Sequence, residues 1–151
     1  MPATKTRSKP ALHVASPHQD WLAQLDKLLA NIQAWGRELD WATRRIEKRM
    51  RDADIGSYLA PALLLQHETL RLLVEPISSA APGVDGLVEV YLMPAYDDVA
   101  RLFLCDGRWS LSYVWSQTPR VQFGIEPKPI RLTKAVFHRV VDEMKNNATQ
   151  D

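Results

Sequence analysis

Apolar residues in the first third of the chain recur at helical spacing. Four of them stand seven residues apart, as along the seam of a coiled coil: Leu25, Ile32, Leu39 and Ile46. Before them, Ser16 can cap a helix and Pro17 suits its first position, while Gly56 can cap the far end. The pattern predicts one helix over residues 17–54, with Gly36 as the place where it could break instead. The apolar seam of such a helix would need a cover, which predicts a homodimer formed through residues 17–54.

The spacing of apolar residues changes in the middle of the chain. Residues 57–68 are expected to form a turn and a short buried helix that starts at Pro61. Strict alternation then takes over in "TLRLLVEPI" and "LVEVYLM", which is typical of half-buried strands. In the second of these strands, Glu89 and Tyr91 are expected to point outward.

The segment "RLFLCDGRWSLSY" has the pattern of a β-hairpin. Asp106 and Gly107 suit a two-residue type I′ turn, in which both residues have a positive φ. This turn fixes a register with four expected pairs: Cys105–Arg108, Leu104–Trp109, Leu102–Leu111 and Ala100–Tyr113. One face of that register is almost wholly apolar, so the turn and the hydrophobic pattern agree.

The remaining elements complete a prediction of the fold. "VQFGI" could add a strand, and "TKAVFHRVVDEMKNN" predicts an amphipathic helix capped by Thr133. The expected fold is α+β, with an antiparallel sheet of four or five strands packed by the long N-terminal helix and the C-terminal helix. Residues 1–15 are expected to form a disordered basic tail, residues 16–147 a single domain, and residues 148–151 a flexible end.

Composition narrows the class of protein. The 151 residues suit one domain, and no run of eighteen apolar residues exists, so no membrane-spanning helix is expected. A single cysteine, Cys105, fits a reducing cytoplasm. The net charge of +1 is too small to indicate a nucleic-acid binder by itself.

One segment is nevertheless strongly basic. "WATRRIEKRMR" contains five cations against the single acid Glu47: Arg44, Arg45, Lys48, Arg49 and Arg51. On a helix, Arg44, Lys48 and Arg51 would share one face, which could neutralise several phosphates. The alternative is a solvated helix face whose cations pair with acids elsewhere in the fold.

A second candidate site is the loop "PAYDD". Its paired carboxylates, Asp97 and Asp98, could divide acid and base roles or hold Mg²⁺ together with Glu89. Aspartate is also a common turn former, and Tyr96 would make this segment a recognition loop. No metal or other cofactor is expected, because no further ligand stands at a suitable spacing.

These observations lead to three hypotheses of function. The first is a non-enzymatic interaction or accessory module that assembles through residues 17–54 and presents the basic segment or the "PAYDD" loop to a protein partner. The alternative is a nucleic-acid-binding protein that uses residues 41–51 and the basic tail. The second alternative is a small hydrolase or nuclease centred on Asp97, Asp98 and Glu89.

Overall fold

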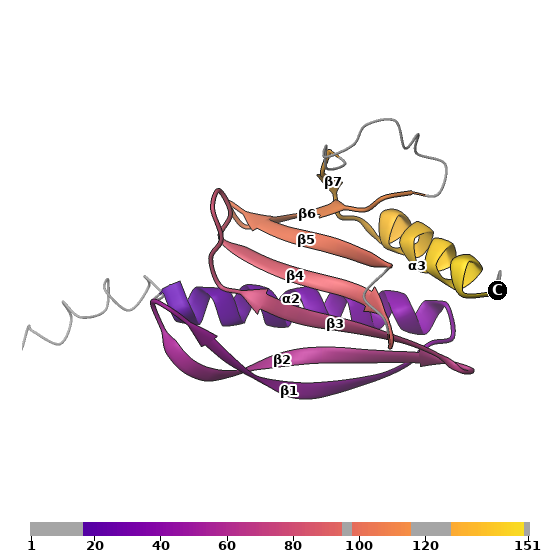
Figure 1. Cartoon of the computed structure of the whole chain (residues 1–151), viewed down its shortest axis with the longest axis horizontal. Helices are drawn as coiled ribbons and strands as arrows, with labels where there is room; N and C mark the ends of the chain where they lie inside the picture. The colour runs from indigo at the N-terminus through magenta and orange to yellow at the C-terminus, as the bar shows by residue number, and fades with distance from the viewer. Residues whose placement is uncertain (1–16, 95–97, 116–127, 150–151) are drawn as a thin grey trace, which may run out of the picture.

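A computed structural model describes residues 17–94, 98–115 and 128–149. Its elements follow one another as α2 (Pro17–Glu38), β1 (Ala42–Asp52), β2 (Gly56–His67), β3 (Leu70–Ser78), β4 (Gly86–Leu92), β5 (Val99–Cys105), β6 (Arg108–Ser112), β7 (Ile130–Arg131) and α3 (Lys134–Thr149). The strands form one antiparallel sheet in chain order, shown in Figure 1. The α+β class is therefore confirmed, although the sheet has seven strands where four or five were expected.

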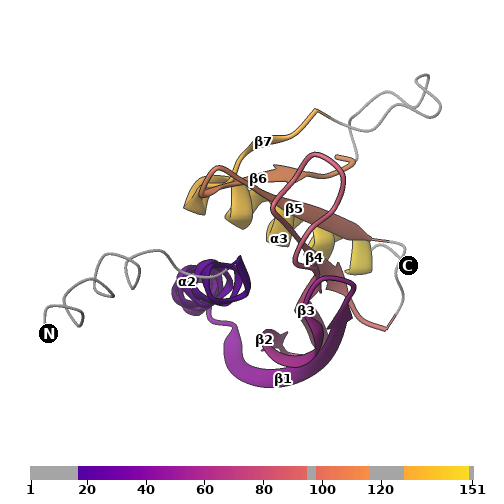
Figure 2. The same ribbon diagram turned by 90° about the vertical axis from the view of Figure 1, so that its left-hand side faces the viewer.

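Both helices pack on the same, concave face of the sheet. Figure 2 shows the sheet as an arc with α2 and α3 on its inner side. The helices contribute nine buried side chains to one continuous core: Trp21, Leu25, Leu28, Leu29, Ile32, Phe137, Val140, Val141 and Met144. Their ends meet where the rings of Trp35 and Phe137 lie 5.8 Å apart. The convex face of the sheet carries no helix of the described chain.

The predicted helix over residues 17–54 is wrong, because α2 ends at Glu38. Asp40 has a φ of 67°, and its N–H donates to the carbonyl of Arg37 at 3.0 Å. The N–H of Trp41 donates to the carbonyl of Gly36 at 3.0 Å. This pair of bonds is a Schellman motif, with aspartate at the left-handed position that glycine usually takes. The chain reverses here, and residues 42–52 continue as strand β1.

The homodimer expected through residues 17–54 loses its basis in this fold. Leu25 and Ile32 are both 0% exposed, since they face the chain's own sheet. Ile46 lies in β1, on a different element from the rest of the expected seam. The apolar stripe that needed a second chain to cover it is already buried within one chain.

The helix expected from Pro61 is also wrong, because residues 56–67 form strand β2. Pro61 is tolerated there because β2 pairs with β3 only from Leu63 to His67. The ladder with β1 runs without a break, with Pro61 opposite Glu47. A proline can lie within a strand where its missing N–H faces a side that has no ladder.

The strands predicted by alternation are confirmed, as is the hairpin register. Three of the four expected pairs are present, Cys105–Arg108, Leu104–Trp109 and Leu102–Leu111, around a turn in which Asp106 and Gly107 both have positive φ. The fourth, Ala100–Tyr113, is not part of the ladder, because β6 ends at Ser112. Thr133 accepts the N–H of Val136 at 3.2 Å, as the expected cap of α3. Tyr91 differs from its prediction, since it is only 6% exposed. "VQFGI" lies outside the described residues.

The register of the β5–β6 hairpin predicts unequal effects of two neighbouring truncations. Leu111 is buried on the concave side, whereas Ser110 is half-buried on the other side. Leu111→Ala should lower the free energy of unfolding by about 2–5 kcal/mol, because it leaves a cavity. Ser110→Ala should change it by less than about 1 kcal/mol. Urea denaturation measures both, and equal losses would contradict this register.

The Schellman motif predicts that Asp40→Gly stabilises the protein. Glycine adopts a positive φ without the steric cost that aspartate meets, and the change removes a negative charge from a helix C-terminus. After the greater freedom of glycine in the unfolded chain is allowed for, we expect a gain of about 0.5 kcal/mol. Asp40→Asn, which removes the charge alone, separates the two contributions. A melting temperature lowered by Asp40→Gly would show that the helix does not end in this way.

Candidate functional site

Strand β1 forms a long open edge of the sheet. It pairs with β2 and with no other strand of the sheet (Figure 1). Its 11 residues extend over about 37 Å. A row of backbone N–H and C=O groups along this edge has no strand of the described residues beside it. Such an edge is a ready template for another extended chain.

The five basic residues of the "WATRRIEKRMR" segment do not share one face. They lie on a strand, where successive side chains point to opposite sides, so the expected helix face of Arg44, Lys48 and Arg51 is wrong. Arg45 bonds Asp26 of α2 at 2.5 Å, through one side chain that is 33% exposed and another that is 64% exposed. Lys48 lies 3.2 Å from the Glu75 carboxylate and donates to the Pro76 carbonyl at 2.7 Å. Two of the five cations are thus bound within the chain.

The other three cations are exposed. Arg44, Arg49 and Arg51 form no ion pair with any residue in the described ranges. Exposure along β1 switches from the even-numbered positions at Arg44 to the odd-numbered positions from Glu47 onward. Since the ladder with β2 keeps one register throughout, this switch is a twist of the two-stranded ribbon and not a bulge. The twist keeps all three arginines in solvent along one edge.

Apolar surface accompanies the exposed cations. A shallow pocket of about 320 Å³ lies beside Arg44, lined by Ala42, Thr43, Leu64 and Gln66. Farther along the edge, Leu59 of β2 is 50% exposed and stands opposite Arg49. The edge therefore offers apolar contacts as well as charge.

The far end of the β1–β2 ribbon is tied to the rest of the fold by Tyr58. Its hydroxyl donates to Asp52 and accepts the indole N–H of Trp21 at 3.0 Å. Asp52 also accepts the backbone N–H of Ser79 at 3.3 Å. Burial and the hydrogen bond to the Asp52 carboxylate raise the pKa of Tyr58 to about 12. These bonds join α2, both strands of the ribbon and the segment after β3.

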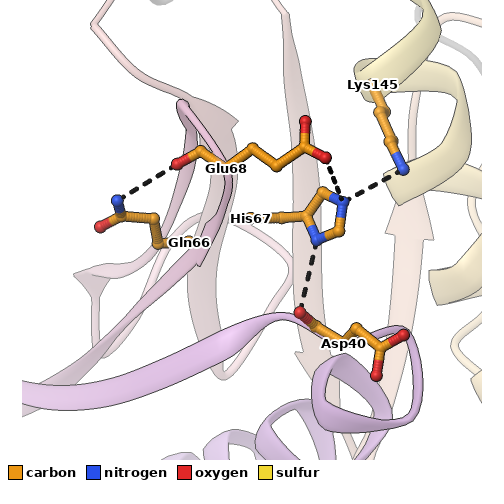
Figure 3. Close-up of polar contacts among 5 residues, drawn as sticks. All are labelled: Asp40, Gln66, His67, Glu68 and Lys145. Atoms are coloured by element: carbon orange, nitrogen blue, oxygen red, sulfur yellow. Dashed lines mark hydrogen bonds and ion pairs between the residues drawn. The ribbon is translucent and has the colours of Figure 1, made fainter.

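The near end of β1 is tied down by His67, shown in Figure 3. Its Nδ1 lies 3.3 Å from the carbonyl of Asp40, and its Nε2 lies 3.5 Å from the Lys145 ammonium of α3. Nδ1 can donate and Nε2 can accept in one neutral tautomer. Glu68 approaches Nε2 to 3.8 Å, and the Trp41 ring lies 5.4 Å away. Both ring nitrogens face groups of the protein itself, so the cluster holds three segments together.

No signal in the sequence could have found this cluster. His67 and Lys145 are 78 residues apart. Neither residue has a metal-ligand or catalytic spacing to the other, and only the packing of α3 beside the β2–β3 turn brings them together.

The structure does not bring Asp98 and Glu89, two of the candidate catalytic acids, together in one site. Asp98 accepts the Tyr113 hydroxyl at 2.7 Å and the Asn147 amide at 3.0 Å, on the side of the helices. Glu89 points to the opposite face, where it bonds Arg101 at 3.2 Å. Burial and the Asp98 carboxylate raise the pKa of Tyr113. Tyr96 and Asp97 lie outside the described residues.

Two further findings concern ligands and relatives. Within the described ranges, no group of three or more His, Cys, Asp or Glu residues is placed to hold a metal ion, and no helix is long and apolar enough to cross a membrane. No protein-family model, curated protein or solved structure shows a significant match to the chain.

The anchoring role of Tyr58 predicts a loss of stability at alkaline pH. Its pKa is higher in the folded chain than the ordinary value of 10.0, so its stabilising effect is complete below about pH 10. That effect is lost as the pH rises towards about 12. Tyr58→Phe should be less stable than wild type at neutral pH and should lose less stability over this alkaline range. Urea denaturation at several pH values measures this, and parallel pH curves for the two proteins would contradict it.

Proposed function

We propose that the chain is a non-enzymatic interaction module that binds a segment of a partner protein along β1. The observation that carries this proposal is the edge itself: 11 residues with three exposed arginines and, within the part of the chain that the structure describes, no strand beside them. Addition of an extended segment to a sheet edge is a recurrent form of peptide recognition. The cytoplasmic location expected from the single cysteine stays a prediction.

Charge on an edge strand also has a simpler role, which is to prevent sheets from pairing edge to edge. An edge that serves only to prevent such pairing would need charged side chains but little exposed apolar surface. Here, however, the Leu59 side chain and the pocket beside Arg44 flank the cations. Apolar contacts next to charged groups are typical of protein interfaces, and they favour a binding role.

A nucleic acid is the rival ligand for the same arginines. Its phosphate backbone presents only hydrogen-bond acceptors, whereas the open edge presents N–H donors and C=O acceptors in alternation. Glu47 and Asp54 are exposed among the arginines and would repel phosphates. These features favour a polypeptide. A hydrolase centred on Asp98 and Glu89 is not proposed, because their side chains point to opposite faces of the sheet.

Site-specific photo-crosslinking tests the proposal. A benzophenone side chain at position 47 of the full chain, which is exposed on β1 and leaves the three arginines in place, should crosslink a protein in an extract of the source cells. The same group at Lys27, which is exposed on α2, should not crosslink that protein. The crosslinked species should be sensitive to protease and resistant to nuclease. Equal crosslinking from both positions, or a nuclease-sensitive product, would contradict a protein-binding edge.

A further inference from the structure

We infer that the partner segment is an acidic strand that adds antiparallel to β1, with carboxylates opposite Arg51, Arg49 and Arg44. This inference rests on the proposed function and specifies the chemistry and register of the partner. It follows from three features of β1: which backbone groups are open, where the exposed cations stand, and which occupants the charges exclude.

Pro61 identifies the backbone groups that face outward. The β1–β2 ladder runs past Pro61 unbroken, whereas the β2–β3 ladder stops at Leu63. The position of the missing N–H of Pro61 is therefore on the side of β2 that faces β3. Pro61 and Glu47 then form a non-hydrogen-bonded pair of the β1–β2 ladder. The N–H and C=O of Glu47 then point to the open edge. Since the pattern repeats every second residue, those of Arg45, Arg49 and Arg51 do so as well.

The exposed cations give the added strand a charge pattern. The Cβ atoms of residues that stand directly opposite in neighbouring strands lie about 4.5–5.5 Å apart, which is close enough for a carboxylate to pair with an arginine. We number the partner strand from the residue that stands opposite Arg51. Because the partner runs antiparallel to β1, its third residue then stands opposite Arg49 and its eighth opposite Arg44. The fifth residue stands opposite Glu47 and is not acidic. The antiparallel direction agrees with every pair of the sheet.

Charge argues against two other occupants of the open edge of β1, a second copy of β1 and the chain's own residues 1–16. Strand β1 contains five basic residues against Glu47 and Asp52, so two copies of it paired edge to edge would repel each other. Residues 1–16 of the chain contain Lys5, Arg7 and Lys9 and no acid, so they do not complement this edge either. An acidic segment from another protein does.

A synthetic peptide tests the charge pattern. It has nine residues, with glutamate at positions one, three and eight and threonine or valine elsewhere, and fluorescence anisotropy measures its binding to the full chain. The peptide with glutamine in place of glutamate should bind about tenfold more weakly or worse, and added salt should reduce the difference. Arg49→Glu with Arg51→Glu should weaken binding similarly. The matched control, Lys128→Glu with Arg131→Glu, makes the same change of net charge at exposed positions in and just before β7, at the opposite edge of the sheet from β1, and should bind as wild type does.

Three further peptides keep the test independent of folding defects. A peptide with lysine at positions one and three should bind the Arg49→Glu, Arg51→Glu variant better than it binds wild type. N-methylation at positions three and five, whose N–H groups would face β1, should abolish binding, whereas N-methylation at positions four and six should not.

Equal binding of the glutamate and glutamine peptides would overturn the inferred acidity, and equal effects of the two N-methylation patterns would overturn strand addition. Tighter binding of a single-stranded DNA of about twenty nucleotides than of the acidic peptide would overturn the choice of partner. Each of these results leaves the protein-binding edge to be judged by crosslinking at position 47.

Discussion

The fold depends on the burial of one face of α2 in the curve of the sheet. Leu25, Leu29 and Ile32 are fully buried there, and each such side chain contributes about 1.5–3 kcal/mol. Close approach is possible because glycine stands at two contact points. A Cβ on Gly86 would lie 2.8 Å from Cε3 of Trp21, and a Cβ on Gly36 would lie 2.6 Å from Cδ2 of Leu65. The helix can therefore sit deep in the arc.

The position of α2 also decides the shape of the edge. Thr43 accepts the Gln33 amide at 2.9 Å, and Arg45 bonds Asp26, so the first half of β1 follows the helix. In the second half, the other side of the strand turns inward, and Met50 is buried. The ribbon twists around the helix, and among the described strands none pairs with the outer side of β1. The open edge is thus a consequence of how the sheet packs on α2.

The sequence predicts the second half of the chain better than the first, for a physical reason. The Asp106–Gly107 turn and the alternation around it specify the same register, so that hairpin is well determined. The end of α2 has no such agreement, because Asp40 takes a left-handed conformation without being glycine or asparagine. Residues 41–51 keep Ile46 and Met50 at helical spacing, and residues 57–68 form a short apolar run that suits a strand or a helix. Whether these segments form helices or strands is decided by their packing against α2 and β3. The local sequence pattern carries no information on such contacts between distant segments. The same error placed the basic residues on a helix.

An open edge strand that binds a partner must not pair with the same strand of another copy of the protein. A set of charges of one sign serves both needs, because it repels an identical edge and attracts a strand of opposite charge. Repulsion acts between any two identical basic edges, whatever their register, whereas attraction to an acidic strand requires acids at matching positions. Because exposed ion pairs each contribute little, selectivity would come from several such pairs acting together in one backbone register. A rigid edge makes that register the same at every encounter. The bonds of Tyr58 at one end of β1 and of His67 at the other hold the strand in a fixed shape. These two clusters bond groups of the chain itself and include none of the exposed arginines, so they position the edge without using its free cations.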